Sequence, residues 1–128
     1  MQKSTEIING KPRIVATLEI PWGIEKIVKD GKEEEIQKVS IVKIKKLNFG
    51  EFNEIQRASM KVTMFGNQPK LDLDSVAMNE QSILKSVIDA PFQVNDINII
   101  RELDRELAEI ILGFINELNM SSDKKKEN

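Results

Sequence analysis

The sequence contains no cysteine, no histidine and no tyrosine. Without cysteine there is no disulfide framework, so nothing argues for secretion. The missing histidine and cysteine also remove the commonest general base, the thiol nucleophile and the usual zinc and haem ligands. Asp, Glu and Lys could still support catalysis, but they form no recognisable constellation. We therefore expect a protein that is not an enzyme and that has neither a cofactor nor a metal site.

Long apolar runs are missing as well. No run approaches the roughly 20 residues that a membrane-spanning helix needs. The first ten residues, MQKSTEIING, lack the apolar core of a signal peptide. We expect a cytoplasmic protein with no membrane contact, located in the host cell cytoplasm if the protein is viral.

The composition is that of a folded chain with flexible ends. Its 128 residues are 40% hydrophobic and 31% charged, with a net charge of −2. We expect one α+β domain over residues 1–119 and a disordered polar tail over residues 120–128. Charge is unevenly spread: residues 1–46 hold ten Lys+Arg and seven Asp+Glu, whereas residues 47–119 hold six and twelve. The two halves are therefore expected to present different surfaces.

The first third of the chain has the period of strands. Asn9-Gly10 predicts a tight hairpin turn that sets Glu6 opposite Arg13. Residues 13–20 alternate between apolar and polar side chains, as in a half-buried strand. Asp30-Gly31 marks a second hairpin with two candidate registers. A two-residue loop pairs residue 24 with 37, and a four-residue loop pairs 24 with 39 and 29 with 34. Matching of side chains favours the four-residue loop.

Helical signals follow after residue 46. Asn48 and Glu51 have the spacing of a capping box, and a face of residues 52, 55, 59 and 62 follows. Residues 66–69 (GNQP) break this pattern, and a polar loop is expected to lead to residues 71–74, where Asp74 caps a second helix over about residues 75–88. Asp72 and Asp74 are interpreted as capping residues because no further oxygen ligands follow at the spacing of a calcium loop.

The third predicted helix spans residues 95–119 and is the longest. Its apolar face covers about half of the circumference, which a small sheet and two short helices would not cover completely. Asp104 falls within this face, either paired with Arg101 near its edge or set at an interface. The order of elements predicts an antiparallel β-meander of three to four strands followed by three helices, packed as an α+β domain.

Two segments resemble a known family. Residues 46–52 (KLNFGEF) resemble the L-(S/T)-F-G-(D/E) start of a helix in tail assembly chaperones of long-tailed phages and proviruses. Residues 86–92 (SVIDAPF), followed by Asn95-Asp96 and Leu103-Asp104, are similar to a second landmark of that family, a helix that ends at a proline before the last helix begins. The resemblance covers roughly residues 38–118, and the β-meander departs from the more helical members.

This resemblance implies a non-enzymatic assembly factor that shields the apolar tape-measure protein and recruits tail-tube subunits. It implies a protein partner and allows a homo-oligomer. From this resemblance we expect the interface to contain six apolar residues, and the pattern of the last helix adds Asp104. The full set is Phe49, Phe52, Phe92, Ile100, Asp104, Leu107 and Phe114. The alternative is a small nucleic-acid-associated regulator that uses a basic sheet with Lys38, Lys43, Lys45 and Lys46. A solvated lysine face in an acidic chain is the stronger interpretation of those residues, so nucleic acid is not expected as a partner.

Overall fold

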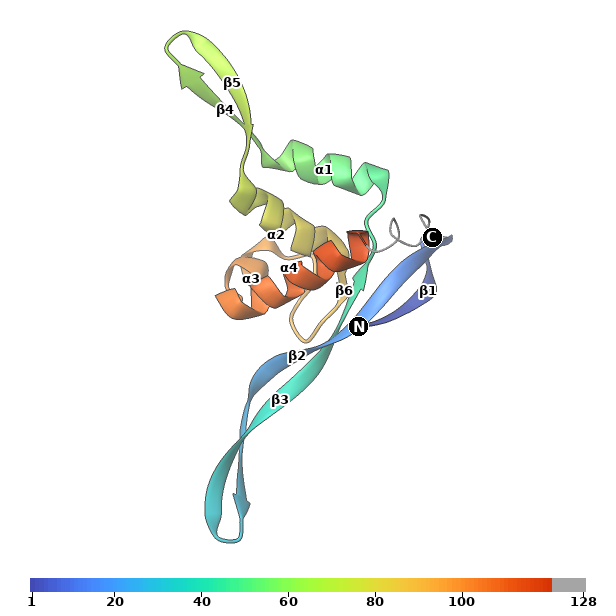
Figure 1. The fold of residues 1–128 in the computed structure, drawn as a ribbon, viewed down its shortest axis with the longest axis vertical. Helices are drawn as coiled ribbons and strands as arrows, with labels where there is room; N and C mark the ends of the chain where they lie inside the picture. The colour runs from blue at the N-terminus through green and yellow to red at the C-terminus, as the bar shows by residue number, and fades with distance from the viewer. Residues whose placement is uncertain (121–128) are drawn as a thin grey trace.

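The computed structural model describes residues 1–120, which form an antiparallel sheet, a separate hairpin and four helices (Figure 1). The sheet has the order β1-β2-β3-β6, and β4 pairs with β5 alone. The strands are β1 (Gln2–Ile8), β2 (Lys11–Lys29), β3 (Lys32–Lys45), β4 (Met60–Phe65), β5 (Gln68–Leu73) and β6 (Val87–Asp89). The helices are α1 (Phe49–Ser59), α2 (Ser75–Ser86), α3 (Ile97–Arg101) and α4 (Arg105–Met120). The α+β class is confirmed, with four helices in place of the expected three.

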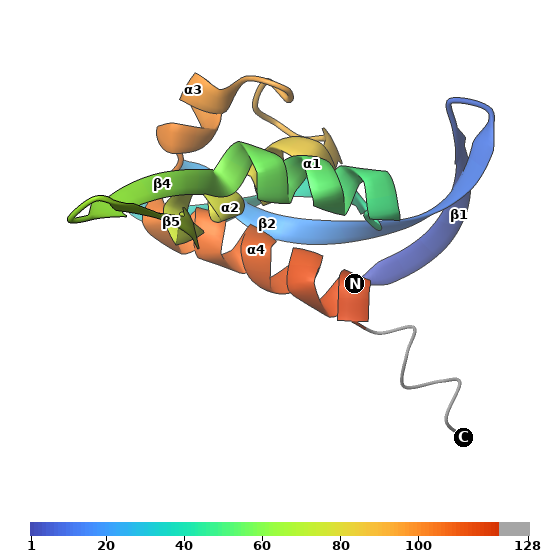
Figure 2. The same cartoon turned by 90° about the horizontal axis from the view of Figure 1, so that it is seen from above.

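The core lies where the first half of β2 meets the helices. Inward residues of β2 and β3, such as Leu18 and Val42, pack in one buried cluster with Ile83 of α2 and with Ile111 and Ile115 of α4. Seen from above, α1 and α4 lie on either side of β2 (Figure 2). Because both faces of β2 are covered there, the consecutive residues 15 and 16 are both fully buried.

The first hairpin forms as predicted. Asn9 and Gly10 adopt φ of 52° and 79°, the two positive values that a two-residue turn with the twist of its strands requires. This turn places Glu6 opposite Arg13. Local turn chemistry was sufficient here because the register of β1 on β2 runs without a shift from the turn to Gln2.

The register chosen for the second hairpin was wrong. Asp30 and Gly31 form a two-residue turn with φ of 53° and 76°, so Ile24 lies opposite Gln37 and Lys29 lies opposite Lys32. A bulge between Pro21 and Ile24 then shifts the pairing by one residue. The turn at Asp30-Gly31 fixes the pairing of the outer part of the hairpin, and the bulge allows the inner part to pair in a different register. The prediction was wrong because it assumed one continuous register along both strands.

The single helix expected over residues 95–119 is broken. Asp96 caps the short α3, which ends at Arg101, and α4 begins at Arg105. The backbone oxygen of Asp104 accepts a hydrogen bond from the N–H of Ala108 (2.9 Å), so Asp104 directly precedes the first turn of α4. Its side chain is exposed. The carboxylate is therefore not buried within an apolar face, and its position at a helix N-terminus is electrostatically favourable.

The caps predicted for the two central helices are confirmed. Asn48 and Glu51 form the reciprocal capping box of α1, and the Asp74 side chain accepts from two backbone N–H groups at the start of α2. The segment between these helices was predicted wrongly. Helix α1 ends at Ser59, so Val62 lies in β4, and the expected polar loop is the turn and strand of a β4–β5 hairpin. The tail predicted over residues 120–128 lies outside the described residues, except for Met120 at the end of α4.

Candidate protein-binding surface

The β4–β5 hairpin has one face made of apolar side chains alone. In the register of this hairpin, apolar residues pair with apolar residues across the two strands at alternate positions. We call this set the apolar ribbon face, and it comprises Met60, Val62, Met64, Pro69, Leu71 and Leu73. Its five Met, Val and Leu side chains are 49–63% exposed. Exposed apolar faces of this size are candidates for contact with another molecule, so the ribbon is a candidate binding surface.

The opposite face of the same hairpin is mainly polar. Lys61 lies opposite Asp72, and Thr63 lies opposite Lys70. Near the turn, the Lys70 ammonium stands 5.7 Å from the centre of the Phe65 ring. The two faces are therefore segregated with the period of two that a half-buried strand shows. A two-stranded hairpin is at best marginally stable in water by itself, which again favours a surface that another molecule covers.

The β4–β5 hairpin is connected directly to α1 and α2 at its base. The backbone N–H of Asp74 donates to the Ser59 oxygen (2.7 Å), which closes the ladder where α1 ends and α2 begins. Gly66 at the turn has a φ of 61°. The hairpin projects from the end of the molecule opposite to the far half of the β2–β3 hairpin (Figure 1). The apolar ribbon face is thus presented free of the protein's own core.

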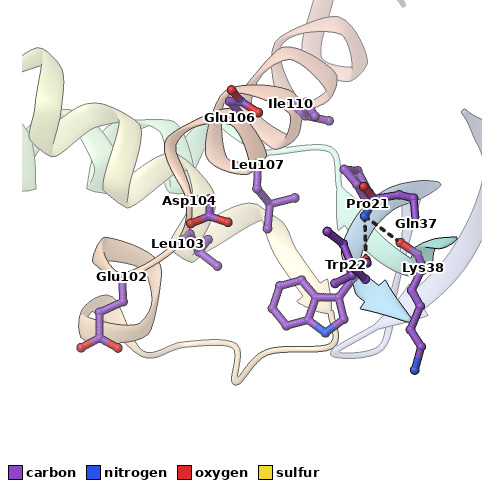
Figure 3. A pocket seen from close by; sticks show the side chains of 12 residues that line it. Pro21, Trp22, Gln37, Lys38, Glu102, Leu103, Asp104, Glu106, Leu107 and Ile110 are labelled. Atoms are coloured by element: carbon purple, nitrogen blue, oxygen red, sulfur yellow. Dashed lines mark hydrogen bonds between the residues drawn. The ribbon is translucent and has the colours of Figure 1, made fainter. Parts of the chain in front are cut away.

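A second candidate surface is a groove between the β2 bulge and the junction of α3 with α4 (Figure 3). Its volume is about 770 Å³. Leu103 in the junction and Leu107 on α4 point toward the space in front of Trp22. The bulge is fixed by Gln37, whose side-chain nitrogen donates to the Gly23 oxygen (2.7 Å). Exposed carboxylates of residues 102, 104 and 106 stand on the helical wall of this groove, so it combines an apolar floor with an acidic rim.

The residues proposed from the sequence do not form one surface. Phe49 is 81% exposed, and Phe52 is also exposed, both on α1. Ile100 and Leu107 are buried in the core, while Phe92 and Phe114 are half-buried against it. Phe92 packs against Trp22 with ring centroids 5.9 Å apart. Of the seven, only Asp104 and Leu107 line the groove together.

Sequence reasoning missed the apolar ribbon face, although a signal for it was present. Met60, Val62 and Met64 alternate with polar residues, and Gly66-Asn67 is a pair that connects hairpin strands. Val62 also continues the spacing of residues 52, 55 and 59, and this spacing predicts that it lies on the face of the preceding helix. The helical period and the strand period both fit Val62, and the turn residues Gly66-Asn67 favour the strand.

A cluster of charges fixes the start of α1 against the sheet. The Glu51 carboxylate forms ion pairs with Arg13 and with Lys45, the latter at 2.6 Å. Partial burial of this carboxylate raises its pKa, whereas hydrogen bonds from Lys45, from the Asn48 backbone and from Arg13 lower it. The lowering prevails, so the pKa of Glu51 lies below the ordinary value of a glutamate. Because the cluster sets the position of α1, it also sets that of Phe49 and Phe52.

Among the lysines considered for a basic sheet, Lys38, Lys43 and Lys45 pair with carboxylates. Lys38 lies 3.9 Å from Glu25, Lys43 lies 3.4 Å from Glu6, and Lys45 pairs with Glu51. Each pairing reduces the positive potential that a phosphate backbone would meet. The geometry therefore supplies no observation that favours a nucleic-acid interface.

Within residues 1–120, no group of three or more Asp or Glu side chains is arranged to hold a metal ion, and no helix is long and apolar enough to cross a membrane. Comparison of the chain with models of protein families, with curated proteins and with solved structures gives no match.

Proposed function

We propose that the protein is a non-enzymatic assembly factor that binds an apolar segment of another protein, in the manner of a phage tail assembly chaperone. The resemblance of residues 46–52 and 86–92 implies the tape-measure protein as the segment's source and the tail-tube subunit as a later partner. The observation that carries the proposal is the apolar ribbon face, which is exposed along its whole length. Phe49 and Phe52 of α1 are further exposed apolar side chains.

The dimensions of the ribbon suit one side of an amphipathic helix. Each strand has six residues, which span about 20 Å at roughly 3.3 Å per residue. A helix of about 13 residues has the same length at 1.5 Å per residue. An apolar helix laid along the ribbon would cover the face, while the polar side of the hairpin stays in water.

The strength of one such contact is small. Complete burial of a Met, Val or Leu side chain contributes roughly 1.5–3 kcal/mol, so the exposed parts of the five side chains contribute about 4–9 kcal/mol at most. Association itself costs roughly 4–15 kcal/mol. One copy would therefore hold a partner weakly, and several copies along a long apolar partner would act together through avidity. Weak contacts of this kind are also readily displaced by tube subunits.

The test requires the neighbouring genes, and the protein is co-expressed with a neighbour's product if that product has long apolar helices. We expect the protein to keep that partner soluble and to co-purify with it. Val62→Lys places an ammonium group in the apolar ribbon face and should reduce co-purification several-fold. Thr63→Lys adds the same charge to the polar face of the same strand and should leave co-purification unchanged.

A second pair of variants examines α1. Phe49→Ala and Phe52→Ala should each weaken co-purification less than Val62→Lys does, because they remove contact area without placing a charge in the interface. If Val62→Lys and Thr63→Lys behave alike, and the alanine variants have no effect, the proposed carrier surface is wrong. If no neighbouring gene encodes a protein with long apolar helices, the assignment to tail assembly is wrong.

A further inference from the structure

The β4–β5 hairpin projects from the body and takes no part in the core cluster (Figure 1). Residues 60–73 are exposed, apart from the half-buried Asp72. The two strands pair with each other alone. The β2–β3 hairpin differs, because its strands run on into the core as part of the four-stranded sheet. The β4–β5 hairpin is therefore held closed mainly by its own cross-strand contacts, which give only marginal stability in water.

The change from exposed to buried is abrupt at the base of this hairpin. Met60 is 49% exposed, whereas the preceding Ser59 is 1% exposed. The Ser59 hydroxyl donates to the Ile55 oxygen (2.6 Å) within α1. On the other strand, the chain passes from the exposed Leu73 to Asp74, whose side chain accepts from two N–H groups at the start of α2. Each end of the hairpin is thus fixed by the helix that it joins.

Helices α1 and α2 are held to each other without the hairpin. They pack against one another, and the Lys85 ammonium lies 2.5 Å from the Glu54 carboxylate across the pair. Ile55 of α1 and Ile83 of α2 are each 2% exposed. Opening of the hairpin would leave these contacts in place, so it would expose none of the core. Segments with few buried contacts are those that open locally in native proteins.

We propose that residues 60–73 open and close as one unit, with the boundary at Ser59 and Asp74, while the rest of the fold remains intact. Strand pairing places the apolar side chains of β4 and β5 on one side of the hairpin. The apolar ribbon face therefore exists in the closed state and is lost when the strands separate. The opening equilibrium is a built-in switch for this surface.

The switch controls partner binding, a consequence that rests on the proposed function. A partner that binds only the closed hairpin has an apparent affinity reduced by the fraction of molecules in the closed state. Binding of an apolar segment in turn keeps the hairpin closed, because it stabilises only that state. A molecule without a partner then presents a continuous apolar face for only part of the time.

The register identifies the amides that report on opening. In an antiparallel pair, hydrogen-bonded and non-hydrogen-bonded residue pairs alternate. Pro69 has no N–H, so its pair with the opposite strand suits the non-hydrogen-bonded type. The next pair, Thr63 with Lys70, is then of the hydrogen-bonded type, as is the pair of Lys61 with Asp72. The amides of these four residues are protected from solvent exchange only while the hairpin is closed.

Native-state hydrogen exchange of the full chain tests the opening. The amides of residues 61, 63, 70 and 72 should share one protection factor, roughly a hundredfold or more below those of Ile111 and Ile115 in α4. Low concentrations of urea should leave their exchange unchanged, because local opening exposes little surface compared with global unfolding. Exchange of these amides together with the core, at one rate and with one urea dependence, overturns the proposal. So does a gradient of protection from the turn to the base, because it indicates fraying rather than one unit.

A disulfide across the hairpin supplies a matched pair of states. The sequence contains no cysteine, so the double variant Thr63→Cys with Lys70→Cys forms one defined bond. The Cα atoms of a hydrogen-bonded pair lie about 5.5 Å apart, within the range that a disulfide spans. Both positions are on the polar face, so the apolar ribbon face keeps all of its side chains.

The oxidised and reduced forms of this variant have the same sequence and differ only in that bond. Oxidation should slow the exchange of the amides of residues 61 and 72 by roughly 10- to 100-fold, as expected for the closure of a short loop. The exchange of Ile111 should be the same in both forms, which shows that the core is unaffected. Equal exchange of residues 61 and 72 in the two forms overturns the proposal.

Binding of a synthetic peptide separates the switch from the proposed function. The probe is an amphipathic helix of about 13 residues with a stripe of leucines, a length that matches the ribbon. The oxidised form should bind it more tightly than the reduced form, by the factor by which the closed state is underpopulated in the reduced form. Equal affinities overturn the control of binding by opening. If neither form binds while the exchange results hold, the proposed function is wrong, and with it the control of binding, whereas the opening unit stands.

Discussion

Replacement of Glu51 by glutamine isolates the charge that fixes α1 on the sheet. Glutamine has nearly the same shape and can still serve in the capping box, so the variant removes mainly the ion pairs with Arg13 and Lys45. The side chains of Glu51 and Lys45 are each 16% exposed. The two cations would then remain partly buried without their counter-charge, which costs more than the loss of a solvated pair.

The expected loss lies between the values for exposed and buried ion pairs. Exposed pairs contribute roughly 0–1 kcal/mol, and breaking a fully buried pair costs about 3–5 kcal/mol. For Glu51→Gln we expect the free energy of unfolding to fall by about 1–3 kcal/mol, measured by urea denaturation at neutral pH. Glu54→Gln is the matched control on the same helix. Glu54 pairs with Lys85 at 2.5 Å, but its side chain is 54% exposed, so the loss should be below about 1 kcal/mol.

The pH dependence follows from the depressed pKa of Glu51. A carboxylate whose pKa is lower in the folded state stabilises the fold fully above its unfolded pKa of about 4.3. That contribution is lost as the pH falls through the lower, folded value. The difference in stability between wild type and Glu51→Gln should therefore be constant near neutral pH and shrink below about pH 4. A difference equal to that of Glu54→Gln, or one that persists unchanged in acid, would refute this account of the cluster.

Two further predictions concern the core. Ile111→Ala should lower the free energy of unfolding by about 2–5 kcal/mol in urea denaturation, because the side chain is fully buried and leaves a cavity. Ile110→Ala, on a neighbouring residue that is 36% exposed, should cost less than half as much; equal losses would contradict the assigned orientation of α4. Ser86→Ala should leave the melting temperature unchanged or raise it, because the buried hydroxyl has no hydrogen-bond partner within residues 1–120. A clear fall would show that this hydroxyl is satisfied in solution.

The features that sequence predicted correctly are local ones. The Asn9-Gly10 turn and the caps at Asn48 and Asp74 each depend on a few adjacent residues whose backbone needs are specific. The register of the second hairpin failed because it depends on a bulge between Pro21 and Ile24, which no pairwise matching of side chains reveals. A bulge changes every pairing beyond it, so its omission displaces a whole strand.

The continuous helix failed for a related reason. The apolar period of residues 97–118 survives the break, since the buried residues Ile100 and Leu107 serve the same core from two separate helices. The signal that could have located the break was Asp104, the polar residue within the apolar arc. An acidic residue at the start of a helix is stabilising, whereas an unpaired buried carboxylate is costly. An acidic residue within an apolar period therefore favours a new helix start at that position.

The candidate surface was predicted only in part for the same physical reason. Of the four phenylalanines in the expected interface, Phe49 and Phe52 are exposed, whereas Phe92 and Phe114 pack against the core. An apolar residue's identity does not reveal which side of the fold it faces. Strand pairing decides which side a residue faces. For residues 60–73 this pairing was not predicted, because Val62 also fits the helical spacing of the preceding residues.

The two projecting hairpins show why segregation of side chains, rather than exposure alone, indicates a partner. The outer part of the β2–β3 hairpin mixes lysine, glutamate and isolated apolar residues on both faces, as at Lys26 opposite Glu35 and Ile27 opposite Glu34. Such a hairpin is solvated on either side and requires no cover. In the β4–β5 hairpin, Val62 opposite Leu71 and Met60 opposite Leu73 place all the apolar contact on one face, while Lys61 and Asp72 meet on the other. Charges distributed over both faces would have kept that hairpin soluble by itself. Their confinement to one face leaves the other to be covered by the apolar segment of a partner, as the proposed function requires.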